Sequence, residues 1–122
     1  MTTAVRALRG ATTVDADTTD DVRSRTIALL QAMVERNGIS HDDVISVLFT
    51  ATDDIHSMFP ATAARDIGFG DVPLICAREL DIVGATPRCI RVLLQFNTDR
   101  SNAELRHVYL EGAAGLRDDL PG

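Results

Sequence analysis

Lysine is absent from this chain of 122 residues, so all twelve basic residues are arginine. Catalysis through a Schiff base on a lysine side chain is therefore excluded. Apolar runs of membrane-spanning length are absent too, and the N-terminus lacks the apolar stretch of a secretory signal. We therefore expect no membrane association and a cytoplasmic location.

Signatures of metal and cofactor sites are also missing. Cys76 and Cys89 form no CxxC pair, and the three histidines show no ligand spacing. The chain has no GxSxG, P-loop, GxGxxG or HExxH motif. We predict no metal site, no disulfide framework and no cofactor. Each cysteine lies in an apolar stretch, which favours a structural thiol over a nucleophile.

The composition indicates one globular domain over residues 1–122, with 45% apolar residues. The net charge is −6 and no arginine run offsets it, which argues against nucleic-acid binding. A chain of this length has little interior for a private pocket. A small-molecule site is therefore expected at a subunit interface.

Hydrophobic periodicity predicts two helices. The first starts after Asp17 or Thr18 as N-cap and ends at Gly38, and its apolar positions recur at helical spacing. The second starts at Pro60, a residue suited to the first helical position, and runs to about Ile67. Residues 40–43 are expected to form a short capping turn.

Apolar runs predict five strands, at Val5–Gly10, Ile45–Thr50, Val72–Ala77, Cys89–Phe96 and His107–Glu111. We expect a turn at residues 10–13 and a short helical turn at 102–106. The continuous apolar run at 45–50 predicts burial on both faces. Pro73 indicates an edge or bulged strand. The alternation of elements predicts an α/β or α+β domain with one mixed sheet packed with two helices.

Arg91 stands within the most apolar predicted strand, CIRVLLQF. A buried guanidinium without a partner is costly, so Arg91 either faces solvent or points into an anionic pocket. Arg9, Glu79 and Tyr109 also lie in or beside apolar strands, and Arg65 lies on the second helix. Together they would suit a small dicarboxylate, although spacing alone does not show that they converge.

Four ordered blocks then carry a family resemblance. They are Arg9–Val14, Ala51–His56 continued by Phe59–Ala61, Cys89–Val92 and Arg106–Glu111. Over Arg6–Asp119 the chain resembles the monofunctional chorismate mutases of the Bacillus type. The resemblance implies an isomerase that converts chorismate to prephenate in the shikimate pathway to phenylalanine and tyrosine. It also implies a homotrimer with a pseudo-α/β barrel and active sites between subunits.

The resemblance implies roles for individual residues. Arg91 would lie beside the ether oxygen of chorismate, where negative charge develops. Arg9 and Tyr109 would bind and orient the substrate, and Glu79 would accept a hydrogen bond from the ring hydroxyl. Arg65 and Arg117 would lie at the pocket mouth. The walls would be formed by Phe59, Ala61, Leu74, Cys76 and Leu116.

One position at the pocket entrance and one on the pocket wall depart from the family pattern. Thr62 stands where the Bacillus enzyme has a lysine, and Ile75 replaces a threonine. The loop at residues 68–71 is also one residue shorter. We expect these changes to affect substrate affinity more than the reaction.

The chemistry of this family agrees with the missing motifs. A Claisen rearrangement is unimolecular and needs no base, nucleophile or metal. The protein must select a compact conformer and place fixed positive charge where negative charge develops. Two alternatives keep the architecture: a trimeric imine or enamine deaminase, and a non-catalytic protein that retains the metabolite pocket. Formation of prephenate discriminates among the three.

Overall fold

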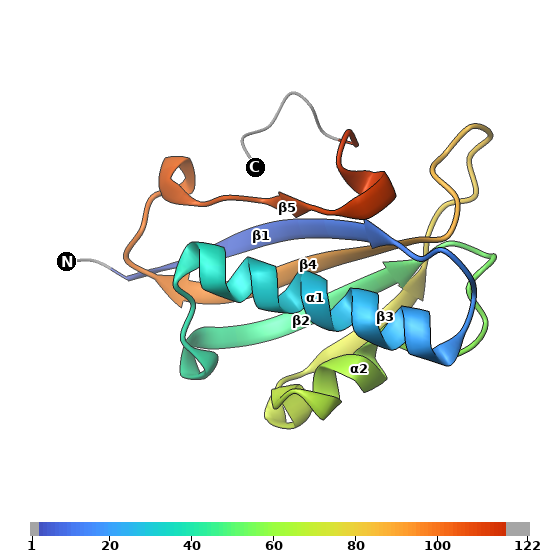
Figure 1. Ribbon diagram of the computed structural model, residues 1–122. Coiled ribbons are helices and arrows are strands. Elements are labelled where there is room, and N and C mark those ends of the chain that lie inside the picture. Colours follow the sequence, from blue (N-terminus) through green and yellow to red (C-terminus); the bar gives the residue numbers. More distant parts are fainter. Residues whose placement is uncertain (1–2, 117–122) are drawn as a thin grey trace.

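The computed structural model describes residues 3–116, which fold around one five-stranded sheet (Figure 1). Its strands are β1 (Ala4–Thr13), β2 (Val44–Ala51), β3 (Leu74–Arg78), β4 (Cys89–Thr98) and β5 (Val108–Tyr109). They lie side by side in the order β3-β2-β4-β1-β5. β4 is antiparallel to both of its neighbours, whereas β3 and β5 run parallel to β2 and β1. The predicted mixed α+β sheet is therefore confirmed.

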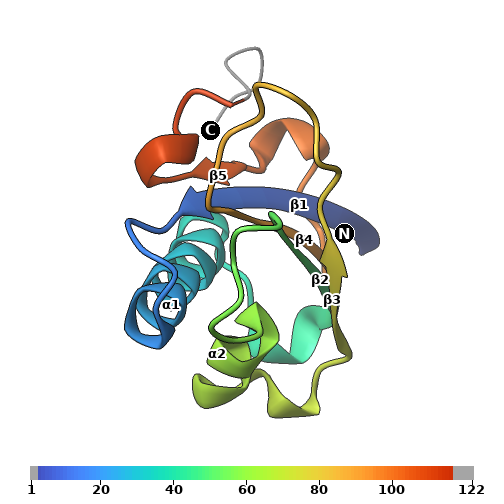
Figure 2. The ribbon, with the colours of Figure 1, turned by 90° about the vertical axis from the view of Figure 1, so that its right-hand side faces the viewer.

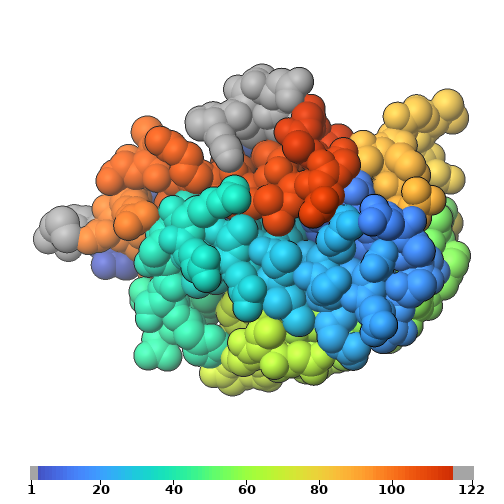
Figure 3. Space-filling view, viewed as in Figure 1, coloured from blue at the N-terminus to red at the C-terminus, as the bar shows by residue number. Residues whose placement is uncertain are grey.

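The two α-helices of the described chain, α1 (Thr19–Asn37) and α2 (Pro60–Asp66), lie on the same side of the sheet (Figure 2). Seen from that side, α1 runs across the front of the molecule and hides the strands behind it (Figure 3). Leu29, Leu30 and Met33 of α1 join Phe49 and Phe96 of the sheet in the main hydrophobic core. Burial of this apolar surface holds the two layers together.

The ends of both helices agree with the predictions. Thr18 is the N-cap of α1, and its hydroxyl accepts a hydrogen bond from the Asp21 N–H at 3.1 Å. Gly38 ends the helix in the left-handed conformation, with φ of 60°, where glycine carries no steric penalty. Pro60 occupies the first turn of α2.

Three short 3-10 turns lie between the main elements, at His41–Asp43, Phe69–Asp71 and Asn102–Glu104, and a fourth follows β5 at Glu111–Ala113. The buried side chain of Asn37 joins the end of α1 to the segment before β5. Its Nδ2 donates to the carbonyl of Arg106 at 2.9 Å, and its Oδ1 accepts from the Arg106 N–H at 2.7 Å. This contact helps to hold β5 beside β1.

None of the helices in residues 3–116 is long and apolar enough to cross a membrane.

The opposite face of the sheet carries no helix in the described part of the chain. Val5, Ile75 and Leu93 are 58%, 64% and 37% exposed there. The prediction that residues 45–50 are buried on both faces is therefore wrong for the single chain. Their side chains alternate between the helix-covered core and this open face.

The turn expected at residues 10–13 is also wrong, because β1 continues to Thr13 and pairs there with Cys89. Gly10 instead allows α1 to lie close to β1. A Cβ atom at this position would lie 2.5 Å from the Met33 sulfur. The predicted last strand shortens to two residues in β5. The edge position predicted from Pro73 is confirmed, because β3 begins at the next residue and lies at the end of the sheet.

Candidate active site

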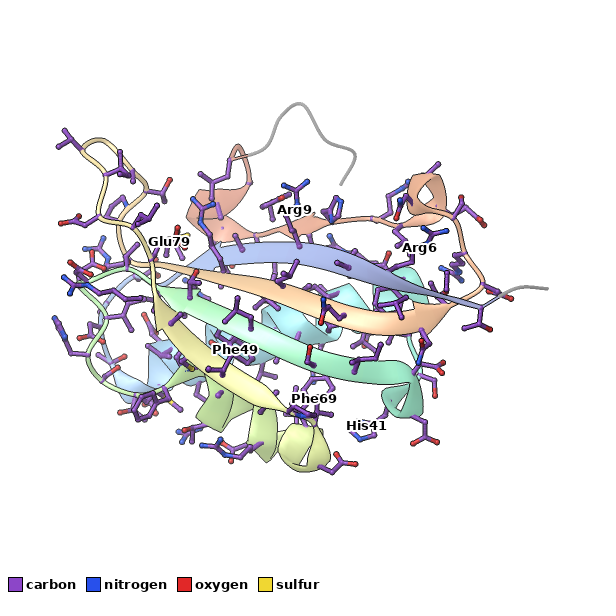
Figure 4. The ribbon with its side chains drawn as sticks, turned by 180° about the vertical axis from the view of Figure 1, so that it is seen from behind. Arg6, Arg9, His41, Phe49, Phe69 and Glu79 are labelled. Carbon is purple, nitrogen blue, oxygen red and sulfur yellow. The ribbon has the colours of Figure 1, made fainter. Side chains whose placement is uncertain are left out.

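A hollow of about 240 Å³ lies on the open face of the sheet. The four residues proposed as catalytic, Arg9, Glu79, Arg91 and Tyr109, all line it. Figure 4 shows this face, with Arg9 on β1 and Glu79 at the end of β3. The sequence placed these residues in four separate segments, and the fold brings them together. We call this space the charged hollow.

Strand register explains the convergence. Arg91 on β4 lies opposite Thr50 on β2 and Ala11 on β1, and Ala11 in turn lies opposite Tyr109 on β5. Residues opposite one another on paired strands project from the same face. A row across four strands therefore directs the Arg91 and Tyr109 side chains to the open face. Arg9 lies two residues before Ala11 and projects the same way.

Arg91 faces Glu79 within the charged hollow. The Arg91 Nε atom lies 3.8 Å from Glu79 Oε2, and the side chains are 41% and 24% exposed. Nε is buried and finds no hydrogen-bond acceptor among the described residues. An unsatisfied buried donor is costly. The arrangement therefore favours a ligand that brings an acceptor to Arg91.

Tyr109 and Arg9 complete the polar lining. The Tyr109 hydroxyl is buried and has no hydrogen-bond partner within residues 3–116. The backbone N–H of Arg9 donates to His107 Nδ1 at 3.0 Å, which ties β1 to the segment that leads into β5. The hollow thus combines two guanidinium groups, one phenol and one carboxylate. This set can bind an anion that also carries a hydroxyl group.

Thr50 is a residue of the hollow that the sequence analysis missed. Its hydroxyl donates to Glu79 Oε2 at 2.6 Å. The Glu79 N–H donates to the carbonyl of Ala51 at 3.0 Å, which extends the β2–β3 pairing by one residue. The signal available in the sequence was one polar residue at the end of an apolar run.

Cys89 lies two residues before Arg91, on the same face of β4. Its side chain is buried against Ala11, Ala113, Tyr109 and Leu116. Burial raises the pKa of the Cys89 thiol, and the nearby Arg91 partly opposes the rise. The prediction of a structural thiol at this position agrees with its burial.

The predicted binding residues lie in a different place. Phe59, Thr62 and Cys76 line a second hollow of about 760 Å³ at the ends of β2 and β3 and the loop before α2. Asp53 and Arg78 form an ion pair in this hollow, with nitrogen–oxygen distances of 2.5 and 2.6 Å. We call this space the loop hollow. Within a single chain, Phe59, Thr62 and Cys76 are therefore separated from the proposed catalytic groups.

The remaining candidates are dispersed. Ala61 is buried in the core, and Leu74 packs against that core. Ile75 projects from β3 and is exposed, and exposed Arg65 on α2 donates to Thr62 Oγ1 at 3.2 Å. Leu116 packs beside Cys89.

Arg117, the second arginine proposed for the pocket mouth, lies outside the described residues. Within residues 3–116, no three His, Cys, Asp or Glu side chains gather closely enough to hold a metal ion.

Comparison with known proteins gives one consistent family. The family model for type I chorismate mutases matches residues 5–120. The chain is 50% identical to chorismate mutase AroH of Thermus thermophilus over 117 residues, covering 95% of this chain and 96% of the relative. It is 42% identical to chorismate mutase AroH of Bacillus subtilis over 117 residues, covering 95% and 92%.

A solved structure agrees with the sequence relatives. The fold superposes on a chorismate mutase from Clostridium thermocellum with a TM-score of 0.87 and 45% identity, covering 88% of this chain and 96% of the other. The chain belongs to the type I chorismate mutases, the AroH class of monofunctional enzymes.

Proposed function

We propose that this chain converts chorismate to prephenate, with Arg91 supplying the charge that stabilises the transition state. The observation that carries the proposal is the buried Arg91 Nε, which has no hydrogen-bond acceptor among the described residues and faces the charged hollow. Family membership indicates the reaction, and the position of the Arg91 guanidinium suits the stabilisation of its transition state.

The rearrangement breaks a C–O bond and forms a C–C bond within one molecule. No proton, electron or leaving group passes to the protein, so atoms and charge balance without an acid, a base or a nucleophile. Negative charge develops on the ether oxygen as the C–O bond lengthens. A fixed guanidinium in a partly enclosed hollow stabilises that charge more strongly than water would, because its position is set before the reaction.

The other polar groups select the reactive conformer. We assign Glu79 to the ring hydroxyl of chorismate, which would donate a hydrogen bond to the Glu79 carboxylate. Arg9 and Tyr109 would hold a carboxylate and the ether region. Contacts on both ends of a small flexible molecule favour the compact conformer in which the two reacting carbons approach each other.

The assembly we infer is a homotrimer with active sites between subunits, built as a pseudo-α/β barrel. Two observations support it. The open face of the sheet exposes Val5, Ile75 and Leu93, and apolar surface of this kind is favourable to bury against another copy. The charged hollow also lacks the walls that lie in the loop hollow, so a second copy would bring its own Phe59, Thr62 and Cys76.

The inferred trimer would also give roles to the remaining predicted binding residues. Ala61, Leu74 and Ile75 would belong to the wall that one subunit presents to the next. Arg65 would attract the dianion at the mouth, and the segment with Leu116 and Arg117 would border it. Thr62 offers a hydroxyl at a position where the Bacillus enzyme carries a cation, so we expect weaker attraction of the substrate there.

The direct experiment follows the loss of chorismate absorbance and the appearance of prephenate with purified protein. The protein should also restore growth, without phenylalanine and tyrosine, to a bacterium that lacks chorismate mutase. A folded protein that leaves chorismate unchanged in both assays would refute the proposal. Heat-denatured protein is the control for the slow uncatalysed reaction.

A further inference from the structure

Thr50 connects two strands at the charged hollow. It lies on the open face of β2, and its hydroxyl donates to Glu79 Oε2 at 2.6 Å, just beyond the end of β3. Both residues are partly buried. We find no other side-chain hydrogen bond to this carboxylate among the described residues. The orientation of Glu79 therefore depends on Thr50.

The same carboxylate oxygen has a competing partner. Glu79 Oε2 lies 3.8 Å from Arg91 Nε, which is buried and without an acceptor in the described chain. Carboxylate and guanidinium groups form close bidentate pairs when nothing holds them apart. A Glu79 released by Thr50 would be drawn to Arg91. That pair would neutralise Arg91 and occupy the hollow.

We propose that Thr50 is a positioning residue that keeps the Glu79 carboxylate away from Arg91, so that both charges remain available to the substrate. The inference rests on the function proposed above, because that function gives Glu79 and Arg91 their roles. Thr50 itself acts through Glu79. Its loss should lower kcat, because Arg91 would be partly neutralised in the transition state.

The chain offers matched variants for the test. Thr50→Val keeps the β-branched shape that suits a strand but removes the donor, whereas Thr50→Ser keeps the donor. Ser46→Ala is the control, because Ser46 lies on the same strand and donates to Gln95 Oε1 at 2.8 Å outside the hollow. A hydrogen bond to a charged group predicts a loss of roughly ten- to hundredfold in kcat/KM for Thr50→Val, mainly in kcat. Thr50→Ser and Ser46→Ala should stay close to the unmodified protein.

A double-mutant cycle with Glu79→Ala separates positioning from a structural role. If Thr50 acts through Glu79, Thr50→Val should cause no further loss of kcat in the Glu79→Ala background. An unchanged kcat in Thr50→Val, or an equal loss in both backgrounds, would overturn the inference. If Thr50→Val does not fold, as judged by its thermal unfolding, Thr50→Ala takes its place in the cycle.

Failure of the proposed function is distinguishable from failure of this inference. The first would give an unmodified protein that produces no prephenate. The second would be seen in an active protein whose rate does not depend on the Thr50 hydroxyl, or depends on it without Glu79.

Discussion

Arg91 and Glu79 face each other across the charged hollow, with Arg91 Nε 3.8 Å from Glu79 Oε2. At this separation the two charges attract but share no hydrogen bond. The carboxylate is held by Thr50, and the guanidinium keeps an unsatisfied buried donor. A substrate with a hydroxyl group would offer a donor to the Glu79 carboxylate. Its developing negative charge would offer an acceptor to the Arg91 guanidinium.

The first prediction concerns metals. Catalysis by fixed arginine charge and conformer selection requires no Lewis acid, so kcat should survive dialysis against EDTA. The measurement is the rate of prephenate formation before and after chelation. Activity that disappeared with the chelator and returned with a divalent cation would contradict the mechanism.

The second prediction concerns assembly. Light scattering should give a mass three times the 13.2 kDa of one chain. Ala7→Glu should dissociate the trimer and abolish activity, because Ala7 is exposed on the open face of β1 and would become buried between copies.

Ala28→Glu is the matched control, because Ala28 is exposed on α1, away from the open face. This variant should remain trimeric and active. A monomer with full activity, or an unaffected Ala7→Glu variant, would exclude the interface we infer.

Local signals predicted much of the fold. The ends predicted for α1, at Asp17 or Thr18 and at Gly38, agree with the structure, because capping chemistry depends on neighbours in the sequence. The turn predicted at residues 10–13 was wrong, since the glycine and threonines there suit a turn as well as a strand. Only the packing of Met33 against Gly10 shows why glycine is needed within a strand.

The site was predictable by residue type more than by position. Arg91 stood out because a charge within an apolar strand is unusual. Its convergence with Glu79 and Tyr109 depends on strand register, which no spacing along the chain reveals. The division of the candidate residues between two hollows depends on where the strands and the loop before α2 lie in space, which residue types alone do not indicate.

A third prediction follows from the ion pair in the loop hollow. The hydrogen bonds and charge of Arg78 hold the pKa of Asp53 below its ordinary value of 3.8. A carboxyl group with a lowered pKa stabilises the fold above its unfolded pKa, and loses this effect as the pH falls through its folded pKa. Asp53→Asn should therefore lower the melting temperature at pH 6, and the difference from the unmodified protein should vanish in acid.

Thermal unfolding at a series of pH values measures this difference. The effect should be small because the pair is partly exposed and screened by salt. Asp99→Asn, at an exposed position outside both hollows, is the control. A difference that grew as the pH fell would show that the sign is wrong.

The fourth prediction concerns the thiols. Cys76→Ser and Cys89→Ser together should leave most of kcat, since no step uses a nucleophile. Stability should fall, because burying a serine hydroxyl at position 89 costs about 1–3 kcal/mol if it finds no partner. Rates and melting temperatures of the double variant test both statements. A folded, trimeric double variant without activity would reveal a role for sulfur.

The most direct test of the account replaces Arg91 with citrulline, which keeps the shape and some donors of arginine but removes its charge. If Arg91 stabilises the developing negative charge, kcat should fall by at least about 10²–10³, as expected for loss of one preorganised group. KM should change much less, because the charge acts mainly in the transition state. The measurement is the steady-state rate of prephenate formation by the folded variant. A citrulline variant with near-normal kcat would contradict the account and leave conformer selection as the source of catalysis.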